Sequence, residues 1–298
     1  MYISNMHQQK PSQVQIKSVI TLYSNGQAQE ALDSVEALIK DYPDEAILHN
    51  ISGACYASLG QLDTAIKHYE KSLSINPNYA EAHNNLGGTR HELGQLDAAV
   101  KSYEQALAIK PDYGEAFNNL GIALKELGQL DTAVKSYEKV LAIRPDFAEA
   151  HYNLGVTLQE LGQLDAAIKS YEQAITIKSD YAEAHNNLGI ALQELGQLDA
   201  SVKSYEKVLA IKPDFVEAHI NLGTILKELG RLEQAEASFR QAIALKPDYA
   251  EAHNNLGITL KELGRLEEAE ACLRQAISLK PDFAEAHSNL GMTLRDLG

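Results

Sequence analysis

Residues 250–283 read AEAHNNLGITLKELGRLEEAEACLRQAISLKPDF, and this stretch decides the fold. Its first part places apolar residues three or four positions apart, as on one face of an α-helix, at Ala252, Leu256, Leu260 and Leu263. Its second part, 266–279, has the same spacing. Gly264 between them is typical of a helix end, and Pro281 disfavours helix in the residue before it. The stretch predicts two helices joined by a tight turn.

The pattern recurs with a period of 34 residues. The segment LGQLD or LGRLE begins at Leu59, Leu93, Leu127, Leu161, Leu195, Leu229 and Leu263. A fixed period of this size indicates a repeat architecture. We expect a tail over residues 1–11 and a single array over 12–298. Its units are 12–45, 46–79, 80–113, 114–147, 148–181, 182–215, 216–249, 250–283 and the half unit 284–298. Positions below are counted from the first residue of each unit.

Glycine placement supports this register. Of the 19 glycines, 17 stand at position 8 or position 15. Position 15 is the predicted turn, whereas position 8 falls inside the first helix, where glycine costs about 1 kcal/mol relative to alanine. The recurrence at position 8 predicts a place where the two helices approach too closely for a side chain. Position 20 is alanine in every full unit except at Ser201, which suggests the same constraint on the second helix.

Composition excludes several functional classes. The 298 residues carry a net charge of −15, which disfavours binding to nucleic acid or to anionic membranes. The sequence has no apolar run long enough for a transmembrane helix, and residues 1–15 lack the apolar core of a signal peptide. Nothing in the pattern pairs Cys55 with Cys272. These features predict a cytoplasmic protein.

The repeat resembles the tetratricopeptide repeat. The family's pattern is matched in one unit by Leu86, Gly87, Ala99, Tyr103, Ala106 and Pro111. The resemblance covers residues 12–298. It implies an all-α fold, a right-handed α-solenoid superhelix of stacked antiparallel helix pairs. The first helix of each pair would line a concave groove with positions 2, 5, 6, 9, 12 and 13.

A row of asparagines runs along the expected groove. Position 6 is asparagine in seven successive units, at Asn85, Asn119, Asn153, Asn187, Asn221, Asn255 and Asn289. Position 5 adds Asn84, Asn118, Asn186 and Asn254. An asparagine side chain offers one acceptor and two donors, which match the polar groups of an extended peptide. The row resembles the asparagine ladder of O-linked N-acetylglucosamine transferase, which implies peptide binding. The alternative is that these side chains bridge helices or face solvent.

Two further groove positions are acidic. Position 2 is Glu81, Glu115, Glu149, Glu183, Glu217, Glu251 or Glu285, and position 13 is Glu92, Glu126, Glu160, Glu194, Glu228, Glu262 or Asp296. Family members that bind acidic tails instead carry basic groove residues, and that arrangement is missing. The predicted partner is therefore a protein or peptide with an extended, neutral to basic segment.

Histidine occupies position 4 in seven units, at His49, His83, His151, His185, His219, His253 and His287. Successive units would hold these rings too far apart to share a metal ion. We expect packed, hydrogen-bonded histidines and no metal. The roles of Gly88, Arg90, Gly114 and Phe117 stay open; Arg90, at a position that is usually buried, either extends to the surface or helps to form a local ligand pocket.

No catalytic motif is present, and no cofactor or catalytic residue is predicted. The carboxylates repeat in every unit, whereas catalysis needs one distinctive place. The sequence therefore predicts a protein-interaction scaffold and not an enzyme. The alternative is the N-terminal, substrate-recruiting array of a longer glycosyltransferase, sulfotransferase or oxygenase-like enzyme, truncated at residue 298. The apolar side of 284–298 would then lack cover, and we expect that it could also support end-to-end self-association.

Overall fold

The computed structural model describes residues 10–298, so residues 1–9 of the expected tail lie outside it. Within the described range every regular element is an α-helix, as predicted. The helices group into two compact units, divided between Asp146 and Phe147, and each unit is described by itself. A single solenoid over 12–298 stays a prediction.

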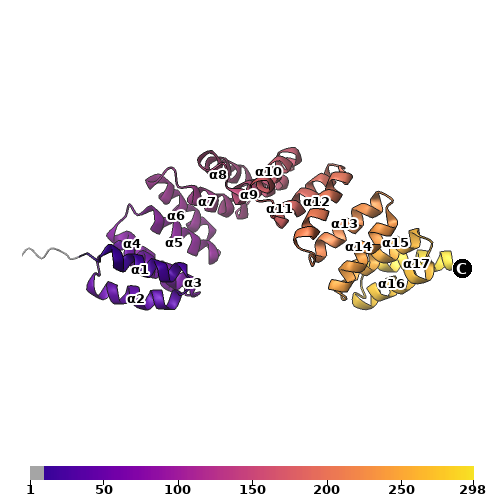
Figure 1. The fold of residues 1–298 in the computed structure, drawn as a ribbon, viewed down its shortest axis with the longest axis horizontal. Helices are drawn as coiled ribbons and strands as arrows, with labels where there is room; N and C mark the ends of the chain where they lie inside the picture. Colours follow the sequence, from indigo (N-terminus) through magenta and orange to yellow (C-terminus); the bar gives the residue numbers. More distant parts are fainter. Residues whose placement is uncertain (1–9) are drawn as a thin grey trace, which may run out of the picture. The chain divides into compact units, whose positions relative to one another are not determined.

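The first unit holds eight helices among its described residues. They are α1 (Gln13–Ser24), α2 (Ala28–Asp41), α3 (Ala46–Ser58), α4 (Leu62–Ile75), α5 (Ala80–Glu92), α6 (Leu96–Ile109), α7 (Gly114–Glu126) and α8 (Leu130–Ile143). Consecutive helices pack together, and Figure 1 shows them as successive hairpins. The first helices of neighbouring repeats also touch, α1 with α3, α3 with α5 and α5 with α7, so they form one continuous face of this unit.

The second unit repeats the arrangement. Its helices are α9 (Ala148–Glu160), α10 (Leu164–Ile177), α11 (Ala182–Glu194), α12 (Leu198–Ile211), α13 (Val216–Glu228), α14 (Leu232–Leu245), α15 (Ala250–Glu262), α16 (Leu266–Leu279) and α17 (Ala284–Leu297). First helices touch here too, α9 with α11, α13 with α15 and α15 with α17. From residue 46 onward every first helix starts at position 1 and every second helix at position 17, so the predicted register is confirmed.

The two recurring glycines have different physical reasons. The turn glycine at position 15 has a positive φ, +73° at Gly94, which side chains rarely adopt. At position 8 the reason is contact, because a Cβ atom on Gly87 would lie 2.6 Å from Cε1 of Tyr103 on the facing helix. The prediction of close helix approach is confirmed, and the aromatic side chain at position 24 is what closes the space. Ser201 donates a hydrogen bond across the same interface to the Gly189 carbonyl at 2.6 Å.

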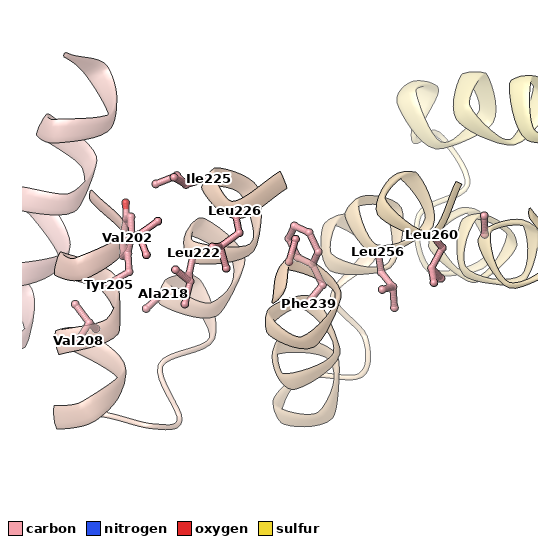
Figure 2. Close-up of a cluster of buried hydrophobic side chains, with 12 residues drawn as sticks. Val202, Tyr205, Val208, Ala218, Leu222, Ile225, Leu226, Phe239, Leu256 and Leu260 are labelled. Carbon is pink, nitrogen blue, oxygen red and sulfur yellow. The ribbon is translucent and has the colours of Figure 1, made fainter. Parts of the chain in front are cut away.

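The hydrophobic core is built from the inner faces of these hairpins. In the second unit one cluster joins α12, α13, α14 and α15 (Figure 2), and Phe239 of α14 lies between Leu226 of α13 and Leu256 of α15. The side chains of this cluster are almost fully buried, with Phe239 at 0% exposure. Each hairpin therefore completes its core with the next one, as expected for a repeat architecture.

Several ion pairs lie along the second helices of the second unit. The pairs Glu236–Arg240 and Glu270–Arg274, each four residues apart on one helix, both form at 2.8 Å. Glu236 also accepts a hydrogen bond from Arg265 at 2.7 Å, and its side chain is only 14% exposed. Burial by itself raises the pKa of Glu236, but hydrogen bonds from the two arginines hold it below its ordinary value.

Helix α17 packs on α16 and α15. Its residues Met292 and Leu294 are each 39% exposed. No side chain approaches the position of a Cβ atom on Gly291, in contrast to the other position-8 glycines. The expected apolar exposure on this helix is thus present only in part, because Ala286 on the same helix is 0% exposed.

Candidate functional site

The seven position-6 asparagines, named here the amide row, all lie half-buried on first helices. Four of them bond to the preceding repeat through the side-chain amide nitrogen. Asn85 donates to Oδ1 of Asn50 at 3.1 Å, and Asn187 donates to the Tyr152 hydroxyl at 3.2 Å. The other two bonds are Asn119 to Asn84 at 3.2 Å and Asn289 to Asn254 at 3.0 Å. The helix-bridging interpretation is therefore confirmed at these four positions.

These hydrogen bonds orient the side-chain amides but use only part of their hydrogen-bonding capacity. Each uses one N–H of a group that has two N–H donors and an acceptor oxygen. For Asn85, Asn119 and Asn289, the hydrogen bonds found among residues 10–298 leave the side-chain oxygen and the second N–H available. Fixed amides with remaining capacity could bond a further polar chain with little loss of side-chain entropy.

Three of the four asparagines at position 5 are largely buried, so they add little to the exposed surface, although Asn84 still lines a hollow described below. Asn84 is 7% exposed, Asn118 9% and Asn254 2%. The physical reason is that this position faces the next first helix, where Asn84 and Asn254 act as the acceptors for the amide row. Asn186 is half-buried.

The acidic position 2 is balanced inside its own repeat. Lysine at position 31 pairs with the carboxylate at position 2, in Lys110–Glu81 at 3.8 Å and Lys280–Glu251 at 3.5 Å. The ammonium group of Lys110 also lies 4.7 Å from the ring centre of Tyr113. Sequence reasoning missed these lysines, although lysine recurs at position 31 before an aromatic residue at position 34.

Position 13 takes part in a second row of contacts between repeats. Position 12 of one unit meets position 13 of the next, 35 residues later. His91 lies 3.0 Å from Glu126, and the Gln159 amide donates to Glu194 at 3.0 Å. Lys261 pairs with Asp296 at 3.1 Å. The contacts at positions 5–6 and 12–13 thus run in parallel, two helical turns apart.

Each unit contains a hollow on the face made by its first helices. In the first unit, a hollow of about 330 Å³, named here the α3–α5 hollow, is lined by Tyr23, Ala54, Ala57, Tyr69, Asn84, Asn85, Gly88, Thr89, Glu92 and Asn119. In the second unit, a hollow of about 270 Å³, the α15–α17 hollow, is lined by Ile258, Lys261, Glu262, Leu273, Asn289, Met292 and Thr293. Three residues of the amide row therefore border open space.

The histidines at position 4 serve packing. The Nε2 atom bonds to the backbone carbonyl six residues earlier, for example from His83 to Pro77 at 3.0 Å and from His185 to Ser179 at 3.2 Å. The same bond forms at His49, His219, His253 and His287. The expectation of hydrogen-bonded histidines is confirmed, and each ring fastens its helix to the loop before it.

The structure shows the contacts of the four residues in 80–117 whose roles the sequence left open. Arg90 is a half-buried residue that donates to Ser102 at 2.9 Å and pairs with Glu70 at 3.2 Å, which agrees with the first of the two alternatives, extension to the surface. Gly88 borders the α3–α5 hollow. A Cβ atom on Gly114 would meet Val140 at 3.4 Å, and Phe117 is half-buried.

No group of three histidine, cysteine, aspartate or glutamate side chains within residues 10–298 is placed to hold a metal ion. Over the same residues, no helix has the length and apolar character needed to cross a membrane.

Comparison with known proteins agrees with the geometry. Family models described as "TPR repeat" match residues 123–162, 158–196, 192–230 and 223–264, and models described as "Tetratricopeptide repeat" match 44–112, 102–135 and 250–283. No curated protein matches.

Many solved structures are similar to this chain. One of MamA is 29% identical with a TM-score of 0.52, over 54% of this chain and 94% of that one. YrrB, described as a TPR protein with an unusual peptide-binding site, is 22% identical with a TM-score of 0.58, over 63% and 97%. A Cut9–Hcn1 complex structure is 15% identical with a TM-score of 0.55, over 98% and 57%. The chain belongs to the tetratricopeptide repeat family.

Proposed function

We propose that this protein is a binding scaffold whose first-helix face holds an extended segment of another protein through the amide row. The observation that carries the proposal is the α3–α5 hollow, where Asn85 and Asn119 border open space and keep an acceptor and a donor each. An extended peptide presents alternating N–H and C=O groups that pair with such amides. Recognition of the main chain would make binding tolerant of sequence.

Charge favours a neutral to basic partner. The carboxylates at position 13 are all exposed, and the whole chain carries a net charge of −15. The position-2 carboxylates contribute less, because the lysines at position 31 neutralise several of them. A negative surface speeds association with a basic segment and repels an acidic one.

Recurrence favours binding over catalysis. The same amides, carboxylates and histidines return every 34 residues, so the groove offers many similar weak contacts in place of one distinctive pair of reacting groups. Such a surface suits multivalent capture of a long segment.

The test uses three unstructured fifteen-residue peptides of matched composition with net charges of about +3, 0 and −3, measured by fluorescence anisotropy at low salt. We expect the basic and neutral peptides to bind the wild-type chain more tightly than the acidic one. The double variant Asn85→Ala/Asn119→Ala should weaken binding by about 1–3 kcal/mol, from two hydrogen-bonding side chains.

The matched control removes two amides from exposed second-helix positions, in Gln105→Ala/Gln173→Ala. This control should bind like wild type. Circular dichroism must show that the Asn85→Ala/Asn119→Ala variant keeps its helical content, because both residues also bridge repeats. Equal binding by that variant and wild type, or tighter binding of the acidic peptide, would contradict the proposal.

A further inference from the structure

The α3–α5 hollow lies where two neighbouring units carry small residues at position 9. Ala54 and Gly88 occupy that position there. The other units carry larger residues, at Ile20, Ile122, Val156, Ile190, Thr224, Ile258 and Met292. The small lining residues at position 9 are therefore a local feature of these two units.

One carboxylate in the hollow lacks the partner that its equivalents have. Glu92 stands at position 13, and the preceding position 12 is Ala57, which cannot pair with it. At the corresponding junctions Glu126 faces His91 and Asp296 faces Lys261. Within residues 10–298, no ion pair or hydrogen bond is found for the Glu92 side chain, which is exposed.

The remaining lining suits a cation as well. No lysine, arginine or histidine borders the hollow. Tyr23 is 37% exposed and lines the hollow together with Asn85 and Asn119, whose side chains carry acceptor oxygens. A carboxylate, neutral acceptors and an aromatic face together bind a guanidinium or ammonium group.

The α15–α17 hollow provides the contrast. It contains Glu262 as its position-13 carboxylate, but Lys261 also lines it and pairs with Asp296. Its position-9 residues are Ile258 and Met292, which are large. A cation belonging to the chain is already present there, whereas the α3–α5 hollow has none.

We propose that the α3–α5 hollow is an anchor subsite for one basic side chain of the bound segment, with arginine preferred. The guanidinium pairs with Glu92, stacks on Tyr23 and donates to the neighbouring amide oxygens. Arginine is preferred because its planar group stacks on a ring and carries five donors, whereas lysine has a compact ammonium. The proposal rests on the proposed peptide binding. It adds the place at which one side chain fixes the position of the bound segment along the first-helix face.

The experiment compares two peptides that differ in one group. Both are unstructured fifteen-residue chains of glycine, serine and alanine; one has a central arginine, and the other has citrulline, which keeps the shape and removes the charge. The arginine peptide should bind wild type about tenfold more tightly, as expected for hydrogen bonds to a charged group.

Three variants should abolish this preference by different means. Glu92→Gln removes the charge, Ala57→Lys supplies the cation that Lys261 provides elsewhere, and Gly88→Ile places a large side chain in the hollow. Each should bind the arginine peptide as weakly as the citrulline peptide. Glu262→Gln is the matched control and should keep the tenfold preference.

The outcomes separate this inference from the proposed function. Equal binding of the two peptides to wild type, or a preference that survives Glu92→Gln and Gly88→Ile, overturns the anchor while main-chain binding stands. Failure of both peptides to bind overturns the proposed function and the anchor with it. N-acetylarginine amide, titrated by NMR, should shift the backbone signals of Gly88 and Thr89 in wild type but not in Glu92→Gln; no shift in wild type counts against the anchor.

Discussion

Two adjacent glycines in α5 should respond oppositely to alanine. At Gly87 a Cβ atom would lie 2.6 Å and 2.7 Å from ring atoms of Tyr103, whereas at Gly88 the nearest atom is the Tyr103 hydroxyl oxygen at 3.9 Å. Both glycines are inside the same helix, so both gain about 1 kcal/mol of helix propensity on substitution. The difference between the variants therefore isolates the contact with Tyr103.

The magnitude follows from how little the ring can move. Tyr103 is 2% exposed, so the added methyl group in Gly87→Ala must displace packed atoms. Overpacking of this kind costs about 1–3 kcal/mol. Subtracting the propensity gain leaves Gly87→Ala destabilised by roughly 0–2 kcal/mol, whereas Gly88→Ala is stabilised by about 0.5–1 kcal/mol.

Urea unfolding followed by circular dichroism measures both variants against wild type. Because repeat arrays do not always unfold in one step, the two substitutions are best compared in the same repeat, where they act on the same transition. Gly291→Ala is the control, since nothing lies within 4 Å of its added Cβ atom, and it should stabilise. A Gly87→Ala variant as stable as Gly88→Ala would refute the contact argument.

Three further predictions concern individual side chains. Ser201→Ala removes the buried hydrogen bond to Gly189 and should cost about 0.5–1.5 kcal/mol of unfolding free energy in urea titrations. Cys55 is 0% exposed, and burial raises the pKa of its thiol to about 11. A thiol reagent near pH 8 should therefore label the half-buried Cys272 first and Cys55 only on unfolding. Equal labelling rates for the two cysteines would contradict this. Because the pKa of Glu236 is lowered in the folded protein, its contribution to stability is complete above the ordinary pKa of 4.5 and is lost as the pH falls through the lower folded pKa. The variant Glu236→Gln lacks this contribution at every pH. Its thermal unfolding temperature should therefore depend less on pH in the acid range than that of wild type.

The fold could be predicted from the sequence because each unit marks its own helix ends. Gly94 fixes the turn with a positive φ, and Pro111 disfavours continued helix in the residue before it. These signals lie within one unit and need no knowledge of its neighbours. They give helix starts that match the structure from residue 46 onward.

The candidate site could be predicted only in part, because its orientation depends on contacts between units. The amide row was found from its recurrence, but nothing within one repeat indicates that Asn84 faces the next helix and is 7% exposed. The pairing of Glu81 with Lys110 lies within one unit, but it joins residues 29 positions apart that no local pattern connects. The hydrogen bond from Asn85 to Asn50 joins residues 35 positions apart, so it becomes visible only when neighbouring units are compared at that spacing.

The sequence contains features that mark the α3–α5 hollow, but the strong similarity of the units makes them easy to overlook. Ala54 and Gly88 break the pattern of large residues at position 9, and Ala57 breaks the polar pattern at position 12. In a chain of similar units, such departures show where a surface differs from its copies. Their proximity could be recognised only once α3 and α5 were placed side by side.

The central claim is that side-chain amides hold the main chain of a partner, and one measurement addresses it directly. A peptide that binds the first-helix face is compared with a version in which alternate amide bonds are replaced by esters, which removes backbone N–H donors and keeps every side chain. Each lost hydrogen bond should weaken binding to wild type by about 0.5–1.5 kcal/mol, and the loss should shrink in Asn85→Ala/Asn119→Ala. Equal affinity of the two peptides for wild type would contradict main-chain recognition by the amide row.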